Sequence, residues 1–233
     1  MDSFTKDVKA LTFDLFGTVL DLGGSLAPAI GAVLKKKGSP LTPDQFWGKW
    51  RARQRLEQYQ DSMFMVGHSG YLATSRRALE YTLALEAIDS STEEIDELMA
   101  AWQQLSPFPE VKEALPRLAG KFTLMALSNG DPAFLEHLAK SRIQWDFDYI
   151  FSVTKVGRFK PHPSVYRAAM KEMDLEPANC CMISSNSFDV LGARHCGFRA
   201  VYVNRSGLPY EPSPLKPDAT VKDFTELADL LAG

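Results

Sequence analysis

The chain has 233 residues, of which 45% are hydrophobic, and its 26 basic and 29 acidic side chains give a net charge of −3. This length suits one core with a smaller insert, and the apolar share excludes a disordered chain. The balanced charge provides no basic footprint for nucleic acid and no polybasic patch for a membrane, and no apolar run reaches the ~18 residues of a membrane span.

The first predicted element is a short buried strand within residues 8–16, VKALTFDLF, followed by a turn at Gly17 and Thr18. Asp14 stands at the end of this apolar run. A carboxylate in this position is a candidate nucleophile, metal ligand or helix cap.

Residues 25–105 show helical spacing of their apolar side chains, and no strand signal interrupts them. Thr42, with Pro43 next to it, and Ser91, with acidic residues after it, predict the starts of two of these helices. The segment SPFPE at residues 106–110 then returns the chain to its main body.

Strands and helices alternate over the rest of the chain. Strands are predicted at 121–128, 147–153, 180–185 and 200–204, and helices at 131–141, 162–173, 187–197 and 222–232. Short apolar strands separated by helices favour an α/β fold, with a parallel sheet covered on both faces. We therefore predict a core of residues 1–20 and 107–233 and a helical cap of residues 21–106.

Four polar clusters fall where strands of this core should end. They are Asp14 with Thr18; Ser128, Asn129 and Gly130; Lys160; and Ser184, Ser185 and Asn186 with Asp189. Each cluster alone is also explained as a turn, a surface loop or a helix cap. Because parallel strands end at one edge of a sheet, the four together predict an anion-binding site around one carboxylate.

Two further features concern the cellular compartment. The polar N-terminus, MDSFTKDVKA, lacks the pattern of a secretory signal. Cys180, Cys181 and Cys196 are odd in number and have no metal-ligand spacing, because two are adjacent. We expect a cytoplasmic protein with buried, reduced thiols.

Four segments resemble, in order, the four motifs of the haloacid dehalogenase-like hydrolase superfamily: LTFDLFGTVLD, LMALSNG, FKPHPSVYRAA and MISSNSFDVLGARHCGF. The resemblance covers the whole chain, including a helical cap between the first two motifs. Within the superfamily the chain is most similar to the type II (S)-2-haloacid dehalogenases. The resemblance implies a Rossmann-like core and a homodimer.

Phe16 decides between the chemistries of this superfamily. Its phosphatases carry a second aspartate two residues after the nucleophile, which protonates the leaving group and helps to hold Mg²⁺, whereas Phe16 cannot donate a proton. Asn186 stands where a further acid would assist a metal, so Asp14 and Asp189 are a thin ligand set. We therefore predict no bound metal and no other cofactor.

A haloacid requires neither a proton donor nor a metal, because a halide leaves unprotonated. With a reference pKa of about 3.9, Asp14 is ionised at pH 7 and can attack C2 of a 2-haloalkanoate from behind. Hydrolysis of the resulting ester at the Asp14 carboxyl carbon would convert an (S)-2-haloacid into an (R)-2-hydroxyacid. The resemblance implies that Asp189 activates or orients the water, with Lys160 and Asn186 sharing this task.

The resemblance also assigns the neighbouring residues. Lys160 pairs with the nucleophile, and Thr18 and Ser184 hold it in place. Ser128, Asn129 and the backbone N–H groups after Asp14, at Leu15 and Phe16, hold the substrate carboxylate.

The cap should supply an arginine for the departing halide. Arg51, directly after Trp50, matches the family position, while Arg53 is a rival on a different helix face. Phe16, Phe188 and Tyr71 are expected to wall the substrate, and Tyr166 to lie behind the site. The histidines have no shared spacing and predict surface or packing roles rather than a zinc site.

Three alternatives remain open from the sequence. The first is a phosphatase of the same superfamily with an atypical metal site. The second is a non-catalytic relative used for binding or as a structural partner. The third is a dehalogenase directed at another carbon–halogen substrate, such as a haloacetate or fluoroacetate.

Overall fold

The computed structural model describes residues 4–233, and its centre is a six-stranded sheet with the order β5-β4-β1-β6-β7-β8. Every neighbouring pair of these strands is parallel. In sheet order the strands are β5 (Tyr149–Ser152), β4 (Thr123–Ser128), β1 (Ala10–Phe13), β6 (Cys180–Ser184), β7 (Arg199–Val203) and β8 (Ala219–Val221). Residues 1–3, which we assign to the core, lie outside the described residues.

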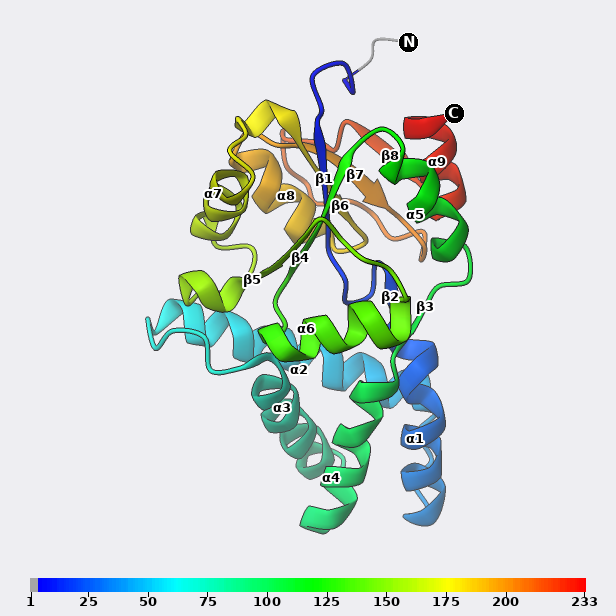
Figure 1. Ribbon diagram of the computed structural model, residues 1–233. Helices are drawn as coiled ribbons and strands as arrows, with labels where there is room; N and C mark the ends of the chain where they lie inside the picture. Colours follow the sequence, from blue (N-terminus) through cyan, green and yellow to red (C-terminus); the bar gives the residue numbers. More distant parts are fainter. Residues whose placement is uncertain (1–3) are drawn as a thin grey trace.

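Helices cover both faces of the sheet, as predicted. Figure 1 shows α7 and α8 on one face and α5 and α9 on the other. The core helices are α5 (Val111–Ala119), α6 (Pro132–His137) with its π-helical continuation Leu138–Ile143, α7 (Pro163–Glu172), α8 (Ser187–His195) and α9 (Phe224–Ala232). Two 3₁₀ turns, Val153–Val156 and Pro177–Asn179, lie between them.

Strand β1 lies at the point where the strand order reverses, between β4 and β6. Phe13 is in register with Ala126 of β4 and with Ile183 of β6. The residues that follow these strands therefore meet at one edge of the sheet, where α/β folds bind ligands.

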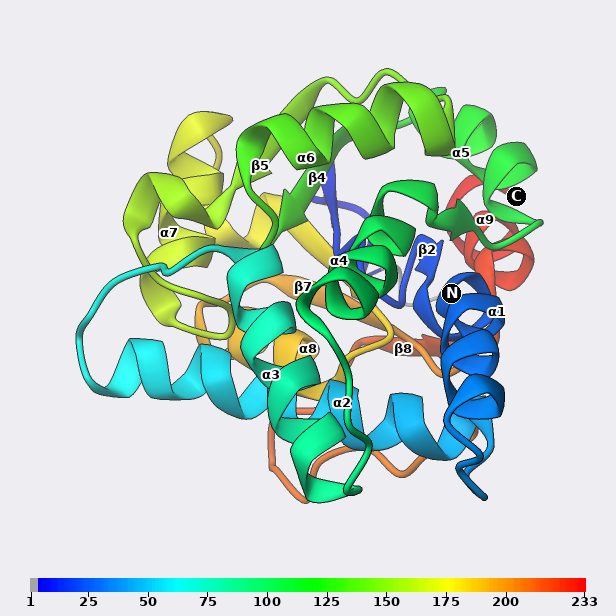
Figure 2. The same cartoon turned by 90° about the horizontal axis from the view of Figure 1, so that it is seen from below.

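Four helices stand beyond this edge; Figure 1 shows them below the strand ends, and Figure 2 views the molecule from their side. They are α1 (Leu22–Lys36), α2 (Pro43–Met63), α3 (Tyr71–Leu85) and α4 (Thr92–Ala100), the last extended by the 3₁₀ turn Ala101–Gln104. Strands β2 (Leu20–Asp21) and β3 (Ser106–Pro107) pair antiparallel at the two junctions. This arrangement supports a division into a cap of residues 21–106 and a core, which we propose as the domain boundaries.

The two predicted helix starts in the cap are confirmed, and each is a capping box. Thr42 Oγ1 accepts a hydrogen bond from Gln45 N at 3.2 Å, and Gln45 Oε1 accepts one from Thr42 N at 2.9 Å. Ser91 and Glu94 make the same pair of bonds at 3.3 and 2.9 Å. Local side-chain chemistry therefore sets where α2 and α4 begin.

Helix α1 begins earlier than its apolar pattern indicates. Asp21 Oδ1 accepts a hydrogen bond from Gly24 N at 2.9 Å and caps the helix. A Cβ on Gly24 would lie 2.2 Å from Asp21 Oδ2, so the cap requires glycine there. Residues that disfavour a helix interior are thus part of its first turn.

Helix α5 and strands β2, β3 and β8 are absent from the sequence prediction, and β2 and β3 have only two residues each. Helix α5 contains Pro116, which predicts a break. Strand β8 has three residues and follows a proline-rich segment, so its apolar signal is weak.

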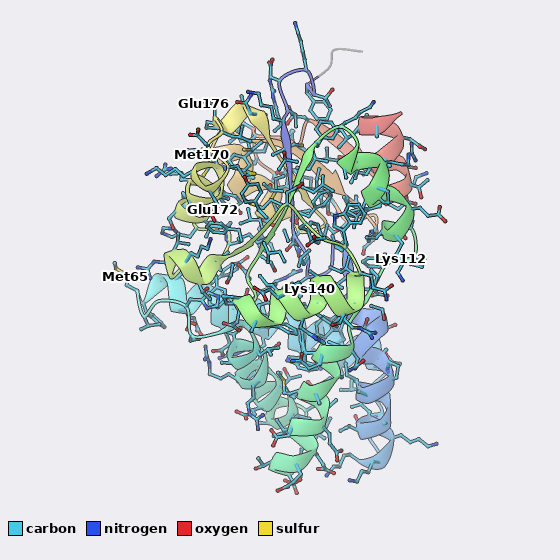
Figure 3. The ribbon with its side chains drawn as sticks, viewed as in Figure 1. Met65, Lys112, Lys140, Met170, Glu172 and Glu176 are labelled. Carbon is cyan, nitrogen blue, oxygen red and sulfur yellow. The ribbon has the colours of Figure 1, made fainter. Side chains whose placement is uncertain are left out.

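The buried thiols and the outer surface complete the fold. Cys180 and Cys181 are buried in β6, whereas Cys196 is half-buried, contrary to expectation. Within residues 4–233, no helix is both long and apolar enough to cross a membrane. Consecutive apolar side chains at residues 63–66 are exposed at the end of α2; Figure 3 shows Met65 there, and it is 75% exposed.

Candidate active site

Asp14 directly follows β1, and only 4% of its surface is exposed. Its N–H continues the sheet by donating to Ile183 O at 3.0 Å. The chain then turns tightly, because Leu15 O accepts hydrogen bonds from the N–H groups of Thr18, Val19 and Leu20. Gly17, with φ at +86°, takes the left-handed conformation that this turn needs.

The two oxygens of the Asp14 carboxylate have different surroundings. Oδ2 accepts hydrogen bonds from Thr18 Oγ1 at 2.9 Å, Ser184 Oγ at 3.2 Å and Asn186 Nδ2 at 2.6 Å. Oδ1 accepts one from Lys160 Nζ at 3.0 Å. Because Oδ1 is less hydrogen-bonded, it is the better nucleophile of the two.

Lys160 is buried between two carboxylates, with 2% of its surface exposed. Besides Asp14, its Nζ donates to Asp189 Oδ2 at 2.7 Å and to Leu127 O at 2.9 Å. Burial opposes the charge, but the Asp14 and Asp189 carboxylates outweigh it and raise the pKa of Lys160. The side chain therefore stays charged between the two carboxylates.

Asp189 lies in the first turn of α8, where Tyr166 of α7 supports it from behind. Tyr166 Oη donates to Asp189 Oδ1 at 2.7 Å. Burial, the largest influence, raises the pKa of Asp189 although Lys160 is adjacent. Burial and the charge of Asp189 also raise the pKa of Tyr166, which keeps its proton and remains a donor.

Ser128 and Asn129 end β4 on the other side of Asp14. Asn129 Oδ1 accepts a hydrogen bond from Lys160 N at 2.9 Å, and its Nδ2 donates to Gln58 Oε1 of α2 at 3.3 Å. Ser128 Oγ and Gln58 Nε2 are buried and have no hydrogen-bond partner among residues 4–233. Two buried donors without a partner in these residues thus belong to side chains next to Asn129.

The aromatic residues predicted to wall the substrate lie in two places. Phe16 is buried and stacks on Tyr71 of α3, with ring centroids 4.0 Å apart and planes inclined by 8°. Leu15 is also buried. Phe188 lies further out, under the Arg55 guanidinium at 5.4 Å and against Tyr59 at 6.0 Å, and does not line the pocket described below.

The two candidate halide arginines diverge. Arg51 lines the pocket, and its Nη1 donates to Gln54 Oε1 at 2.6 Å and to Tyr71 Oη at 3.3 Å. Arg53 instead pairs with Glu57 at 2.5 Å and lies 3.9 Å from the centre of the Tyr81 ring. The structure therefore brings Arg51, and not Arg53, to the pocket.

Sequence reasoning missed three residues that contact the site. Arg55 Nη2 donates to Asn186 Oδ1 at 2.9 Å, and its spacing of four from Arg51 was the available signal. Gln58 continues the same helix face. His68, expected only at the surface or in packing, places Nε2 3.0 Å from Asn129 O and stacks on Phe159. Nothing in the sequence near His68 indicates this contact.

A pocket of about 350 Å³ lies between the cap and the strand ends. Its size is at the small end of the range for small-molecule sites, about 300–1,000 Å³. Its walls include Phe16, Arg51, Arg55, Asn186, Tyr202 and Arg205. Asp14 itself does not line this pocket, but Asn186, which donates to Asp14 Oδ2, does, together with three arginines.

The donor set does not fit Mg²⁺. Asn186 Nδ2 donates to Asp14 Oδ2 at 2.6 Å and to Phe16 O at 3.3 Å, the two oxygens that a cation beside this turn would need. Lys160 Nζ joins Asp14 to Asp189 in the same way. In the described part of the chain, no group of three His, Cys, Asp or Glu side chains could hold a metal ion.

Comparison with known proteins gives one consistent family. The family model for haloacid dehalogenase-like hydrolases matches residues 8–197. The chain is 31% identical to (S)-2-haloacid dehalogenase H-109 of Pseudomonas putida, over 97% of this chain and 99% of that protein. It is 32% identical to the (S)-2-haloacid dehalogenase of Xanthobacter autotrophicus, over 85% and 76%.

Solved structures agree. The L-2-haloacid dehalogenase of Xanthobacter autotrophicus with covalently bound chloropropionic acid superposes with a TM-score of 0.83 and 26% identity, covering 97% of this chain and 99% of that one. Among relatives of known sequence, haloacetate dehalogenase H-2 of Moraxella is 28% identical over 97% of this chain and 99% of that protein.

Proposed function

Because the chain belongs to the haloacid dehalogenase-like hydrolases, and within them to the (S)-2-haloacid dehalogenases, we propose that it hydrolyses small (S)-2-haloalkanoic acids to (R)-2-hydroxyalkanoic acids. One observation carries the proposal. Asp14 is a buried carboxylate whose Oδ2 is held by three donors and whose Oδ1 is less hydrogen-bonded, with Phe16 in place of an acid. A carboxylate in this setting suits attack on carbon.

In the first step, Asp14 Oδ1 attacks C2 of the substrate on the side opposite the halogen. The C2–O bond forms while the C2–halogen bond breaks, and the halide leaves with the bonding electron pair. C2 is inverted, and Asp14 becomes an ester. Lys160 Nζ, 3.0 Å from Oδ1, holds the attacking oxygen by a charge-assisted hydrogen bond until then.

In the second step, water attacks the carboxyl carbon of the Asp14 ester. Oδ2 then carries the developing negative charge, and its three donors, Thr18, Ser184 and Asn186, form a ready oxyanion hole. Asp189 accepts the proton of the water, and because burial raises its pKa, it is a stronger base than an exposed aspartate. The Cγ–Oδ1 bond of Asp14 then breaks, and Oδ1, which stays bonded to C2, takes the proton that Asp189 received from the water. The 2-hydroxyacid leaves with its C2–O bond intact, and the Asp14 carboxylate is restored with one oxygen from the water.

Substrate binding uses one donor that is unpaired in the described part of the chain, Ser128 Oγ, and the polar groups next to it. We place the substrate carboxylate at Ser128 Oγ, which has no partner within residues 4–233, with Asn129 and the N–H groups of Leu15 and Phe16 beside it. Arg51 takes the departing halide. Phe16 and Tyr71 form the apolar wall.

The proposal includes independence from metal. The Asn186 amide donates to the oxygens that Mg²⁺ would need, and this favours a dehalogenase over a phosphatase. Activity should be the same after dialysis against EDTA as after dialysis against buffer. A requirement for an added divalent cation would contradict this part of the proposal.

We also propose that the protein works in the cytoplasm as a homodimer, as the family resemblance implies. The exposed apolar run at residues 63–66 is surface of the kind that protein contacts cover. Light scattering coupled to size-exclusion chromatography tests the assembly, and a monomer at all accessible concentrations would refute it.

The main test is release of halide from fluoro-, chloro- and bromoacetate and from both enantiomers of 2-chloropropionate, without added metal. We expect turnover of the (S) enantiomer and a product of (R) configuration. Asp14→Asn should lose activity while its circular dichroism spectrum and melting temperature stay near those of the wild type. No halide from any of these acids would remove the proposed function, and unchanged activity in Asp14→Asn would remove its mechanism.

A further inference from the structure

Two arginines of α2, Arg51 and Arg55, line the same pocket. They are four residues apart, so they lie on one helix face, where like charges repel each other. Burial and, after it, the charge of Arg51 lower the pKa of Arg55. Placing both guanidinium groups here therefore has an energetic cost in the free protein.

No acidic side chain in the described part of the chain pairs directly with either guanidinium, although the charge of Asp14 offsets part of the cost at Arg55. Among residues 4–233, Arg51 and Arg55 have hydrogen bonds only to the neutral groups of Gln54, Tyr71 and Asn186. Arg55 Nε is buried without any partner in the same residues. The other cap arginines, Arg53, Arg76 and Arg77, are each paired with a carboxylate. The contrast indicates that anions from outside the chain bind at Arg51 and Arg55.

The reaction proposed above uses one of these two arginines. Arg51 receives the halide. The C1 carboxylate binds at Ser128 Oγ, which has no partner within residues 4–233. Gln58 Nε2 is also without a partner in these residues, and the Oε1 of the same side chain accepts a hydrogen bond from Asn129, next to Ser128. Arg55 is therefore left over for a simple haloalkanoate, whose remaining C2 substituent is an alkyl group.

The pocket that Arg55 lines also offers polar groups. Its lining includes Asn186, which Arg55 contacts, and Ser185, Asn204 and Ser206, together with aromatic rings such as Tyr202. Arg205 lines the same wall, but Glu110 already neutralises it. An anionic group here would meet hydrogen-bond donors and one guanidinium without an acidic partner.

Resting on the proposed function, we infer that the preferred substrate carries a second carboxylate on its C2 substituent, and that Arg55 binds this carboxylate. The substrate class is thus the (S)-2-halodicarboxylates, of which (S)-2-chlorosuccinate is the shortest common member. The bonds made and broken are those given above, and the products are halide and an (R)-2-hydroxydicarboxylate. Arg55 is a specificity residue in this scheme.

The test compares kcat/KM for (S)-2-chlorosuccinate with that for its neutral isostere, (S)-3-carbamoyl-2-chloropropionate. (S)-2-chloropropionate and (S)-2-chlorobutyrate provide the reference activity. A charge-assisted bond to Arg55 should favour the dicarboxylate over the amide by about tenfold or more. Arg55→Leu should remove this preference for the dicarboxylate, and Arg55→Lys should keep part of it. The surface control Arg76→Leu should leave the ratio of the two kcat/KM values unchanged.

The ratio is the decisive readout, because Arg55 also contacts Asn186. Equal kcat/KM for dicarboxylate and amide in the wild type would overturn the inference, and this measurement needs no variant. An Arg55→Leu variant that loses activity equally on all substrates would also overturn it, since Arg55 would then only position Asn186. If the wild type releases no halide from the dicarboxylate and amide, and none from chloropropionate and chlorobutyrate either, the result instead counts against the proposed function.

Discussion

Replacing Thr18 by valine should separate the two chemical steps at Asp14. Thr18 Oγ1 donates to Asp14 Oδ2 at 2.9 Å. During attack on C2, Oδ2 changes from a carboxylate oxygen to an ester carbonyl oxygen and loses charge, so this donor gives no advantage to the first transition state. During ester hydrolysis Oδ2 gains charge, and the same bond strengthens. Valine should therefore slow only the second step.

The size of the effect follows from the geometry. Loss of one donor from an oxyanion hole reduces kcat by about 10²–10³-fold, which corresponds to about 2.7–4 kcal/mol. Thr18 Oγ1 also accepts a hydrogen bond from Ser185 N at 2.8 Å. The variant leaves this N–H unpaired, so the free energy of unfolding should fall by about 1–3 kcal/mol.

The assay is rapid-quench halide release from (S)-2-chloropropionate. Thr18→Val should show a burst of about one halide per active site followed by slow turnover, and mass spectrometry should detect the ester on Asp14. Thr12→Val is the matched control, because Thr12 is buried in β1 but contacts Cys181 and Met182 rather than the site. Slower halide release without a burst in Thr18→Val would refute the reasoning.

Three further outcomes are expected. Arg51→Lys should lower kcat/KM for halide release by about tenfold or more, because lysine lacks the planar donors of the guanidinium. Arg53→Lys should leave halide release unchanged. Equal effects of the two substitutions would contradict the assignment of Arg51 as the residue that binds the halide. Asp189 must be ionised to act as a base, so kcat should fall as the pH drops through its raised pKa. Tyr166→Phe should move this fall in kcat to higher pH, because the hydrogen bond that it removes stabilises the ionised carboxylate. An unchanged pH profile of kcat would exclude Asp189 as the titrating base. Gly192→Ala should lower the free energy of unfolding by about 1–3 kcal/mol, because the added Cβ would lie 2.7 Å from Tyr166 Oη. Denaturant titration measures this, and an unchanged unfolding midpoint would show that the neighbouring side chains can move.

The raised pKa of Asp189 also affects stability. A carboxyl whose folded pKa lies above its unfolded value contributes stability at low pH and loses this contribution as pH rises through the folded pKa. The contribution of Asp189 to folding is therefore smallest at the pH where it is most active as a base.

Much of the fold could be predicted because its signals are local. The capping boxes at Thr42 and Ser91 depend on a residue three positions away, and the order of strands and helices follows from the period of the apolar residues. The start of α1 was missed because Asp21 and Gly24 act through a close approach that only the folded chain shows.

The site divides in the same way. The rule that parallel strands end at one edge of a sheet predicts from the sequence alone that Asp14, Lys160 and Asp189 lie together. Arg55 and Gln58 could not be assigned, because their roles depend on which face of α2 docks against the strand ends. Periodicity defines the faces of a helix but not the partner of each face.

With the domain boundaries proposed above, residues 4–233 cross between core and cap at two places, and these crossings are paired with each other as β2 and β3. The nucleophile, its lysine and its base all come from the core side of this double crossing, while Arg51 and Arg55 come from the cap side. A different insert joined at the same two residues would therefore present new recognition groups to an unaltered reaction centre. Substrate preference in such a molecule can diversify by exchange of a module, with no change in the chemistry beneath it.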